Sequence, residues 1–406
     1  MAVRRVSQLR SHAGVNKHRA VRGAGSLAVT AAVCTLLGIV AQSAAAGPRE
    51  QAQRLYDRLA GVPPSAAMLD TLTTDISGGN ALTAAGRAMD DPAFYSVTLK
   101  NFATPWTNRD QTVFAPLNDY TATVIGMVRD DVPFDTALSA DLVYVINDSS
   151  IPAYSPASND HYAQAEINGV DLKSKLTARQ QSAVMGIPVE ATAGLMTTRA
   201  AAAAFFVNGT NRAMFRFTLI NHLCTDLGTV LDTTRPPDRI RQDVSRSPGG
   251  DSRIFLNNCI GCHSGMDPMA QAFAYYNFDN TSQQLVYTAG QVQPKYLINS
   301  DNFKPGFITP DNSWENRWRH GQNQIIGWSP SLPGSGTGAK SLGQELASSD
   351  AFAQCQVQKI FKTVCFRDPS NAADRSKVAQ IKADFVNGQY KMKQAFAEAA
   401  VYCMGQ

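Results

Sequence analysis

The sequence lacks several features that would assign it to a familiar functional class. Apart from one apolar stretch near the N-terminus, it has no hydrophobic run long enough to cross a bilayer. It has no internal repeat at a fixed period. No Ser/His/Asp or paired-carboxylate arrangement can be assigned from it, so hydrolysis has no positive support. It also has no Lys/Arg stripe of the kind that binds nucleic acid.

The first 46 residues contain no Asp or Glu and have the order of an export signal. Basic residues precede an apolar stretch from about 25 to 41, which is followed by Ala44-Ala45-Ala46, a small-residue sequence typical of a cleavage site. A membrane anchor is the alternative, but Thr30 and Gly38 make the stretch a poor span. We therefore predict a signal peptide over 1–46, a periplasmic or secreted mature protein, and no membrane span after cleavage.

Removal of this signal changes the charge of the chain. The mature part has 31 Lys/Arg against 33 Asp/Glu, although the full sequence carries a formal net charge of +4. A nearly neutral mature chain predicts no nucleic-acid partner. The 360 residues that remain are ample for a sizeable core and for two or three packed units.

Helical periodicity dominates the mature chain, and the predicted fold class is mainly α: a multi-helix protein with a minor β-hairpin. Helices are expected at 49–60, 65–75, 80–89, 115–128, at two buried segments of 196–230 separated by Asn208-Gly209, and at 349–365, 371–387 and 391–403. An isolated extended run or a buried turn is expected at 141–147, and a polar surface connection over 148–175. A hairpin is expected over 283–298 about Ala289-Gly290, although Pro294 disfavours its second arm, and a linker or loop over 329–340.

The segment with the most specific chemistry is Cys-Ile-Gly-Cys-His, residues 259–263. Asp251 or Ser252 can cap a helix that carries Cys259, Cys262 and His263 at positions i, i+3 and i+4, so all three project from one face. A covalent haem needs this arrangement: two thiols form thioethers with its vinyl groups, and an imidazole reaches the iron. The motif predicts one covalently attached haem c, with His263 as the proximal iron ligand.

Two other uses of a Cys-x-x-Cys pair fit the sequence less well. A thioredoxin-like dithiol would lie between a strand and a helix of a parallel βαβ unit, and no such unit surrounds the motif. A structural zinc site needs four ligands, and no second close Cys/His pair is present. After the motif, Asp267-Pro268 is expected to disfavour continuation of the helix.

The residues around the motif carry a resemblance to a family. Met266-Asp267-Pro268 closely follows the histidine, and an Ala-Phe pair and Phe278-Asp279 come next. This order resembles the c-type cytochrome-like domains of planctomycete-type exported proteins. Similar segments extend the resemblance over nearly the whole mature chain, at Gly61–Pro64, Gly194–Thr198, Arg235–Pro237 and Leu346–Ser349.

The resemblance implies a cytochrome-c-like haem module, haem binding and electron transfer, but no substrate. The chain departs from the family pattern at Met269-Ala270, where Leu or Gly is expected after Asp-Pro. On this basis we predict four regions of the mature chain. They are an N-terminal helical region (47–175), a helical segment leading to the motif (176–248), a haem-binding module (249–328) and a C-terminal helical module (341–406).

The sixth iron ligand is left open by the sequence. His320 is the first candidate for the distal ligand, because it is far enough along the chain to wrap round the ring; the alternative is an ordinary polar residue. Met214, Met392 and His222 are further candidates, each with an ordinary core role as its alternative. The position can also be open or occupied by water. Met266 and Met269 lie on the proximal side, and His161 lies in the polar connection, so all three are discounted.

Residues near the motif could contact the porphyrin. Arg246 and Arg253 flank the Gly-Gly turn, and either could pair with a haem propionate; the alternative is a surface arginine. Aromatic residues are expected to line a core that includes the porphyrin rather than a separate pocket: Phe255, Phe273, Tyr275, Tyr276, Phe278, Trp314, Trp318 and Trp328.

The four other cysteines of the mature chain can form two disulfides in an oxidising compartment. Cys355 and Cys365 lie about 15 Å apart if they share one helix, which is beyond disulfide reach. If the last three helices run up, down and up, Cys365 and Cys403 fall at the same end. We predict that pair, which leaves Cys224 with Cys355; the alternative is four free buried thiols.

These observations predict an exported monohaem c-type cytochrome-like protein that transfers electrons to or from a redox partner protein or electron acceptor in the cell envelope. The first alternative is a haem enzyme, oxidase or peroxidase-like, with an open sixth iron position, because 360 residues exceed what one haem carrier needs. The second alternative is a cell-envelope binding or scaffold protein. An electron carrier is favoured over a catalyst, and no catalytic residue is assigned.

Overall fold

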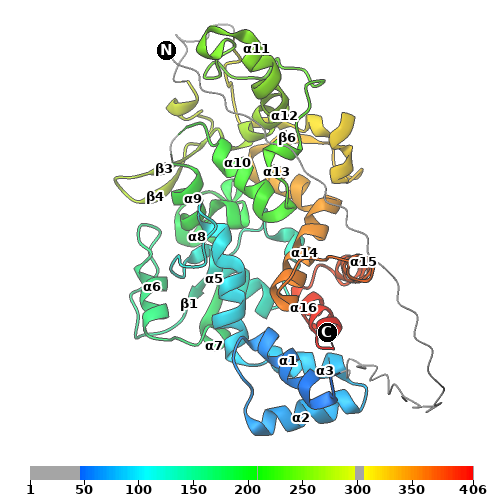
Figure 1. Ribbon diagram of the computed structural model, residues 1–406. Helices are drawn as coiled ribbons and strands as arrows, with labels where there is room; N and C mark the ends of the chain where they lie inside the picture. The colour runs from blue at the N-terminus through cyan, green and yellow to red at the C-terminus, as the bar shows by residue number, and fades with distance from the viewer. Residues whose placement is uncertain (1–45, 208, 298–305, 406) are drawn as a thin grey trace, which may run out of the picture. The chain divides into compact units, whose positions relative to one another are not determined.

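The computed structural model describes residues 46–207, 209–297 and 306–405. The predicted signal peptide, apart from Ala46, lies outside these residues. The described chain is mainly helical and carries small antiparallel two-stranded sheets (Figure 1), which confirms the predicted fold class at that level. Its sheets pair β1 (Val143–Ile146) with β2 (Leu176–Arg179), β3 (Tyr276–Asp279) with β4 (Gln284–Tyr287), and β5 (Ser313–Glu315) with β6 (Ser335–Thr337).

The N-terminal helices form where the sequence predicts them. They are α1 (Pro48–Ala60), α2 (Ala66–Ser77), α3 (Ala81–Met89) and α5 (Asp119–Arg129). The side chain of Ser65 caps α2 by accepting a hydrogen bond from the Met68 amide, and Asn118 caps α5 in the same way. Gly61 ends α1 with φ 75°, a left-handed conformation that glycine adopts without strain.

Two predictions in the next part of the chain are wrong. The extended run at 141–147 is not isolated, because β1 pairs with β2. The segment 148–175 is not only a surface connection, since it contains α6 (Asp160–Ile167) and α7 (Leu172–Lys175). Tyr162 and Ala165 of α6 are buried, so tertiary packing outweighs the turn-forming residues at either side. The helical segment that contains η1 (Phe94–Leu99), α4 (Lys100–Ala103) and η2 (Thr104–Thr107) was not predicted.

The central helices lead to the cysteine motif. As predicted, two helical segments, α9 (Arg199–Phe205) and α10 (Arg212–Thr218), lie on either side of residues 208–209, and the π-helical turn η6 (Leu219–Leu223) extends α10. The motif itself follows on α11 (Ser252–Ile254), η9 (Phe255–Cys259) and α12 (Ile260–Ala270). Asp251 caps α11 by accepting from the Arg253 amide, as expected. Helix α10 packs directly on α12.

The predicted hairpin over 283–298 is wrong in position. Its turn lies before β4 rather than at Ala289-Gly290, because the Asp279 carboxylate accepts hydrogen bonds from the amides of Thr281 and Ser282. Beyond β4 the chain forms the 3₁₀ turn η11 (Pro294–Tyr296) instead of a second arm. The local turn chemistry of Asp279 therefore decides the register.

The predicted loop over 329–340 is wrong at its C-terminal end. It contributes β6 and the start of α13 (Gly338–Ala347). Long-range side-chain contacts explain the difference, because Ser341 accepts a hydrogen bond from the Trp314 indole at 2.8 Å and buried Glu345 pairs with Arg319. The other short helical segments of the described chain are α8 (Gln181–Met185), η3 (Phe134–Thr136), η4 (Val189–Ala191), η5 (Gly194–Thr197), η7 (Leu227–Thr229), η8 (Pro248–Gly250), η10 (Gln271–Phe273), η12 (Arg317–Arg319) and η13 (Gly321–Ile326).

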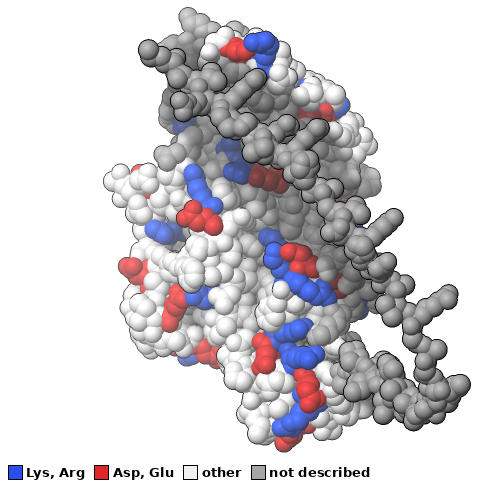
Figure 2. All heavy atoms as spheres, viewed as in Figure 1, with Lys and Arg blue, Asp and Glu red and all other residues white. Residues whose placement is uncertain are grey.

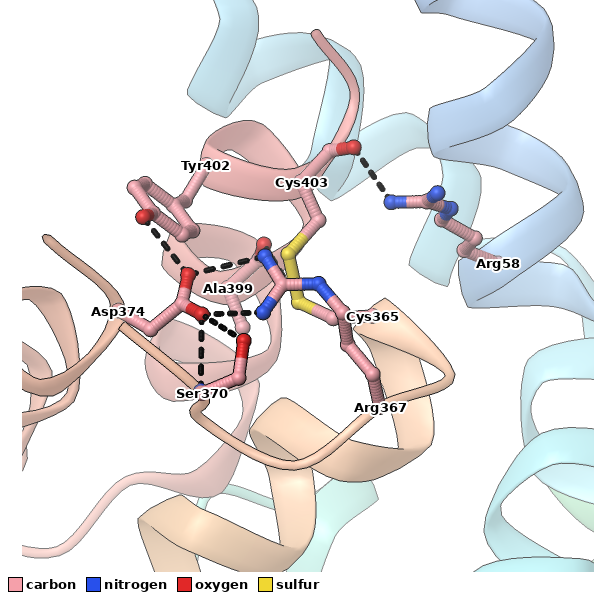
Figure 3. Close-up of a disulfide and its surroundings, with 8 residues drawn as sticks. All are labelled: Arg58, Cys365, Arg367, Ser370, Asp374, Ala399, Tyr402 and Cys403. Carbon is pink, nitrogen blue, oxygen red and sulfur yellow. Dashed lines mark hydrogen bonds and ion pairs between the residues drawn. A yellow bond between two sulfur atoms is a disulfide. The ribbon is translucent and has the colours of Figure 1, made fainter. Parts of the chain in front are cut away.

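The last three helices are α14 (Asp350–Cys365), α15 (Ala372–Asn387) and α16 (Met392–Cys403), and they pack on one another as expected. Both predicted disulfides are confirmed: Cys365 bonds Cys403, and Cys224 bonds Cys355. Figure 3 shows the Cys365–Cys403 bond joining α14 to α16, with the Arg367–Asp374 ion pair beside it and Arg58 of α1 donating to the Cys403 carbonyl. The disulfide thus links α14 to α16, and the hydrogen bond of Arg58 connects α1, the first described helix, to α16, the last.

Replacement of Cys365 and Cys403 by Ser should lower the free energy of unfolding by about 2–4 kcal/mol, because an unfolded chain without the cross-link gains loop entropy. Urea denaturation followed by circular dichroism measures the change. The oxidised and reduced forms of the double variant are the control, since they should differ only through Cys224–Cys355. A loss under about 1 kcal/mol would show that this bond does not constrain the unfolded state.

Candidate haem-attachment site

The motif lies where η9 runs into α12. Cys259 is the last residue of η9, and Cys262 and His263 follow in the first turn of α12. These three side chains are half-buried, whereas Ile260, Gly261 and residues 264–270 are buried. The partly exposed stripe of this helix therefore consists of the two thiols and the imidazole.

Both motif thiols are free. Cys262 contacts the Leu227 carbonyl oxygen at 3.6 Å, and Cys259 packs against the apolar side chains of Ile240, Val244, Phe255 and Ile260. Burial raises the pKa of the Cys262 thiol, and the nearby Asp226 raises it further. The Cys262 thiol is therefore protonated at neutral pH.

His263 is oriented by a carboxylate one turn along the helix. Its Nδ1 lies 3.1 Å and 3.2 Å from the two oxygens of Asp267. Because an ionised carboxylate only accepts hydrogen bonds, Nδ1 carries the ring proton and donates a hydrogen bond to Asp267. The Nε2 atom has no hydrogen-bond partner in the described part of the chain, and the side chain is 19% exposed. A histidine that binds a metal commonly holds its other ring nitrogen in this way.

Asp267 is fully buried and is held by two arginines. Arg212 donates to both carboxylate oxygens at 2.7 Å and 2.9 Å, and the Arg241 guanidinium lies 3.8 Å away. Burial alone would raise the pKa of Asp267, but the charges of Arg212 and Arg241 hold it well below its usual value. The carboxylate is therefore ionised at neutral pH and fixes the tautomer of His263.

The expectation that Asp267-Pro268 stops the helix is wrong, because α12 continues through Pro268 to Ala270. Proline inside a helix costs about 3 kcal/mol, since it removes one hydrogen bond and crowds the preceding turn. The ion pairs of Asp267 and the complete burial of Met269 and Ala270 outweigh that cost. The same burial keeps Met266 and Met269 beneath the helix, away from the partly exposed stripe.

Exposed apolar side chains lie near the motif, whereas the buried side of α12 is tightly packed. Leu231, which lies beside Gly261 of the motif, is 45% exposed, and Ile254 and Leu256, which precede the motif on α11 and η9, are 39% and 54% exposed. Exposed apolar side chains of this kind are typical of a binding surface. On the packed side, a Cβ atom at Gly265 would lie 2.0 Å from the indole Nε1 of Trp318, so α12 approaches that indole too closely for any side chain. The residues present fit a haem held on the exposed stripe.

The predicted distal ligand lies at a different cavity. His320 is exposed between η12 and η13 and lines a hollow with Arg235, Trp314 and Arg317, whose described wall does not include the motif. Its role as an iron ligand stays a prediction. His161, which was placed in a polar connection, is buried, and its Nε2 accepts a hydrogen bond from the Ile146 amide.

The other ligand candidates are buried in the core. His222 is 1% exposed, and its Nε2 lies 2.7 Å from the Tyr120 hydroxyl. Met214 on α10 and Met392 on α16 are each 1% exposed. Burial and existing contacts favour the core role for these three residues.

The predicted porphyrin contacts divide into two groups. Arg246 donates to backbone carbonyls of residues 240–244 and lies over the Phe255 ring, whereas Arg253 is exposed and pairs with Asp251. Most of the aromatic candidates belong to the main hydrophobic core: Phe273, Tyr276, Phe278, Trp314 and Trp318. Trp328 is partly buried and packs against this core. Tyr275 belongs to a separate small cluster, and Phe255 packs beside Cys259.

Sequence reasoning missed the two arginines that hold Asp267. The spacing of His263 and Asp267, four residues apart on a helix, was a usable signal for their contact. Arg212 and Arg241 lie far from the motif in sequence and carried no such signal.

On the face shown in Figure 2, basic and acidic side chains of the described residues are interspersed.

Within the described residues, no three or more His, Cys, Asp or Glu side chains are grouped to hold a metal ion, and no helix has the length and apolar character to cross a membrane. No family model, no curated protein and no solved structure matches this chain.

Substitution of Asp267 by Asn should lower the free energy of unfolding by about 3 kcal/mol, because it breaks a buried ion pair. Asp243 then remains as the one carboxylate that pairs with Arg212 and Arg241. Urea denaturation at pH 7 measures the loss. Asp251→Asn is the matched control: its partner Arg253 is exposed, so the change should be small. Equal effects of the two substitutions would contradict the role given to Asp267.

Proposed function

We propose that the chain is an exported monohaem c-type protein that transfers electrons. The observation that carries the proposal is the stripe formed by two free thiols and His263, with the imidazole fixed by an ionised, buried Asp267. Cys259 and Cys262 would hold the haem through thioethers, and His263 would bind iron through Nε2. When bound, haem supplies a reversible one-electron change at the iron.

The residues of this chain would orient and tune the group. The hydrogen bond to Asp267 would hold the His263 ring in one orientation and leave Nε2 available to a metal, as outer-shell carboxylates commonly do for metal-binding histidines. The packing of Gly265 against Trp318 and the ion pair of Arg212 keep α12 in place. A rigid proximal side keeps the reorganisation on electron transfer small, as a carrier needs.

The location and partner belong to the same proposal. Two disulfides within the described residues are typical of an oxidising compartment, which supports export to the periplasm or beyond. In that compartment the partner would be a redox protein or another electron acceptor of the cell envelope. A family relationship to planctomycete-type cytochrome-like proteins is likewise a proposal, and it rests on the residues around the motif.

A haem enzyme with an open sixth position is the second candidate. The observation that favours it is the burial of His222, Met214 and Met392, which leaves these side chains inside the core. His320 is the remaining candidate of the four. The two functions differ in whether an added ligand reaches the iron.

Expression with periplasmic haem-maturation machinery should give a coloured protein. Mass spectrometry should find one haem added to the tryptic peptide 254–295, which contains both motif thiols. The Cys259→Ser, Cys262→Ser double variant should stay colourless while it keeps its helical circular dichroism. Colourless wild-type protein without added porphyrin mass would end the proposal.

The spectrum of the matured protein separates the two functions. An electron carrier with both axial positions filled should show low-spin iron that does not respond to carbon monoxide or cyanide. His320→Ala should convert it to high-spin iron. An unchanged spectrum of that variant would exclude His320 as the ligand, and prompt cyanide binding by the wild type would favour the enzyme.

A further inference from the structure

A separate cavity of about 760 Å³ lies among η2, η6 and α14. Its wall combines apolar side chains with four basic ones: Arg109, Arg216, Lys359 and Lys362. Asp226 is the acidic residue of this wall. The volume falls in the range of small-molecule sites.

Two of the four cations have their charge balanced by neighbours. Arg216 forms a two-pronged pair with Asp226 at 2.6 Å and 2.7 Å, and Lys362 pairs with Asp368 at 3.2 Å. These pairs account for the acidic group in the wall. The other two cations must therefore be considered by themselves.

Lys359 and Arg109 have no carboxylate within ion-pair distance among the described residues. The Lys359 amine donates to the Asn221 carbonyl and lies 4.3 Å from the centre of the Trp106 ring. The Arg109 guanidinium donates to the backbone carbonyls of Ala204 and Val207. Both cations line the cavity and are held by neutral acceptors, so no carboxylate of the described residues balances their positive charge.

Among the described residues, no negatively charged group influences Lys359 from the interior either. His222 is buried there, and burial together with the Lys359 charge holds the pKa of its imidazole well below the usual value. Burial lowers the pKa of Lys359 itself to about 7. Lys359 is half-buried, and a partly desolvated cation without a counter-ion is unfavourable. An anion in the cavity would reduce that cost.

The rest of the wall favours an organic ligand over a simple ion. Trp106 and Phe102 are buried side chains that form part of it, and Phe217 and Ile220 are half-buried. We propose that this cavity binds a small organic anion, with its carboxylate between Lys359 and Arg109 and its apolar body against Trp106 and Phe217.

The cavity adjoins the cysteine motif. Arg216 and Asp226 belong to its wall, and the next residue, Leu227, contacts the Cys262 thiol. A ligand would thus lie beside the residue that we assign to haem attachment. Binding itself does not depend on that assignment, because neither Lys359 nor Arg109 belongs to the motif.

Isothermal titration of the purified full chain with benzoate tests the proposal. Benzoate should bind, while benzyl alcohol, which lacks the charge, and inorganic phosphate, which lacks the apolar body, should bind far more weakly. Lys359→Met should reduce benzoate affinity at least about tenfold, because it removes a desolvated charge partner. Lys377→Met, on α15 and outside the wall of the cavity, is the matched control and should bind like the wild type.

The pH dependence gives a second readout. Protonated Lys359 attracts the carboxylate, so affinity should fall as pH rises through about 7 and beyond, and this dependence should flatten in Lys359→Met. Arg109 is exposed, so Arg109→Gln keeps the test available if the lysine variant does not fold. Absence of benzoate binding, equal binding of phosphate, or an affinity unchanged in Arg109→Gln would overturn the proposal. Loss of benzoate binding in haem-loaded protein would assign the cavity to the haem instead.

Discussion

The ionised carboxylate of Asp267 is the constraint on which the site depends. It lies fully buried between Arg212 on α10, Arg241 on the segment before the motif, and His263 on α12. Because an uncompensated charge cannot remain at that depth, the three elements must keep their positions for the carboxylate to be satisfied. The orientation of the imidazole, the continuation of α12 past Pro268 and the packing of α10 on α12 all follow from this network.

Much of the fold could be predicted where local signals agree with packing. The caps at Ser65 and Asn118 and the αL residue Gly61 mark the N-terminal helices, and the spacing of Cys355, Cys365 and Cys403 gave both disulfides. The errors arose where long-range contacts decide. Helix α6, the start of α13 and the helical Pro268 are stabilised by partners distant in sequence, and local propensity is a weak guide there.

The same division applies to the candidate site. The positions of Cys259, Cys262 and His263 on one helical stripe followed from their spacing alone, whereas the arginines that hold Asp267 come from other parts of the chain. The histidines divide: His222 has the buried core role that was its alternative, whereas the burial of His161 was not expected. His161 and His222 are both buried and hydrogen-bonded, although the first occurs among polar residues and the second was a possible iron ligand. Burial depends on the folded arrangement, which spacing does not reveal.

The contact between Gly265 and Trp318 has a consequence for how this sequence can diverge. An indole fills the space that a side chain at position 265 would need, so neither residue can change freely while the other stays. A larger residue at 265 requires a smaller one at 318, and a protein with only one of the two changes would be poorly packed at this contact. Among homologues the two positions should therefore co-vary, and a glycine two residues after the motif histidine should accompany a tryptophan on the segment that packs against it.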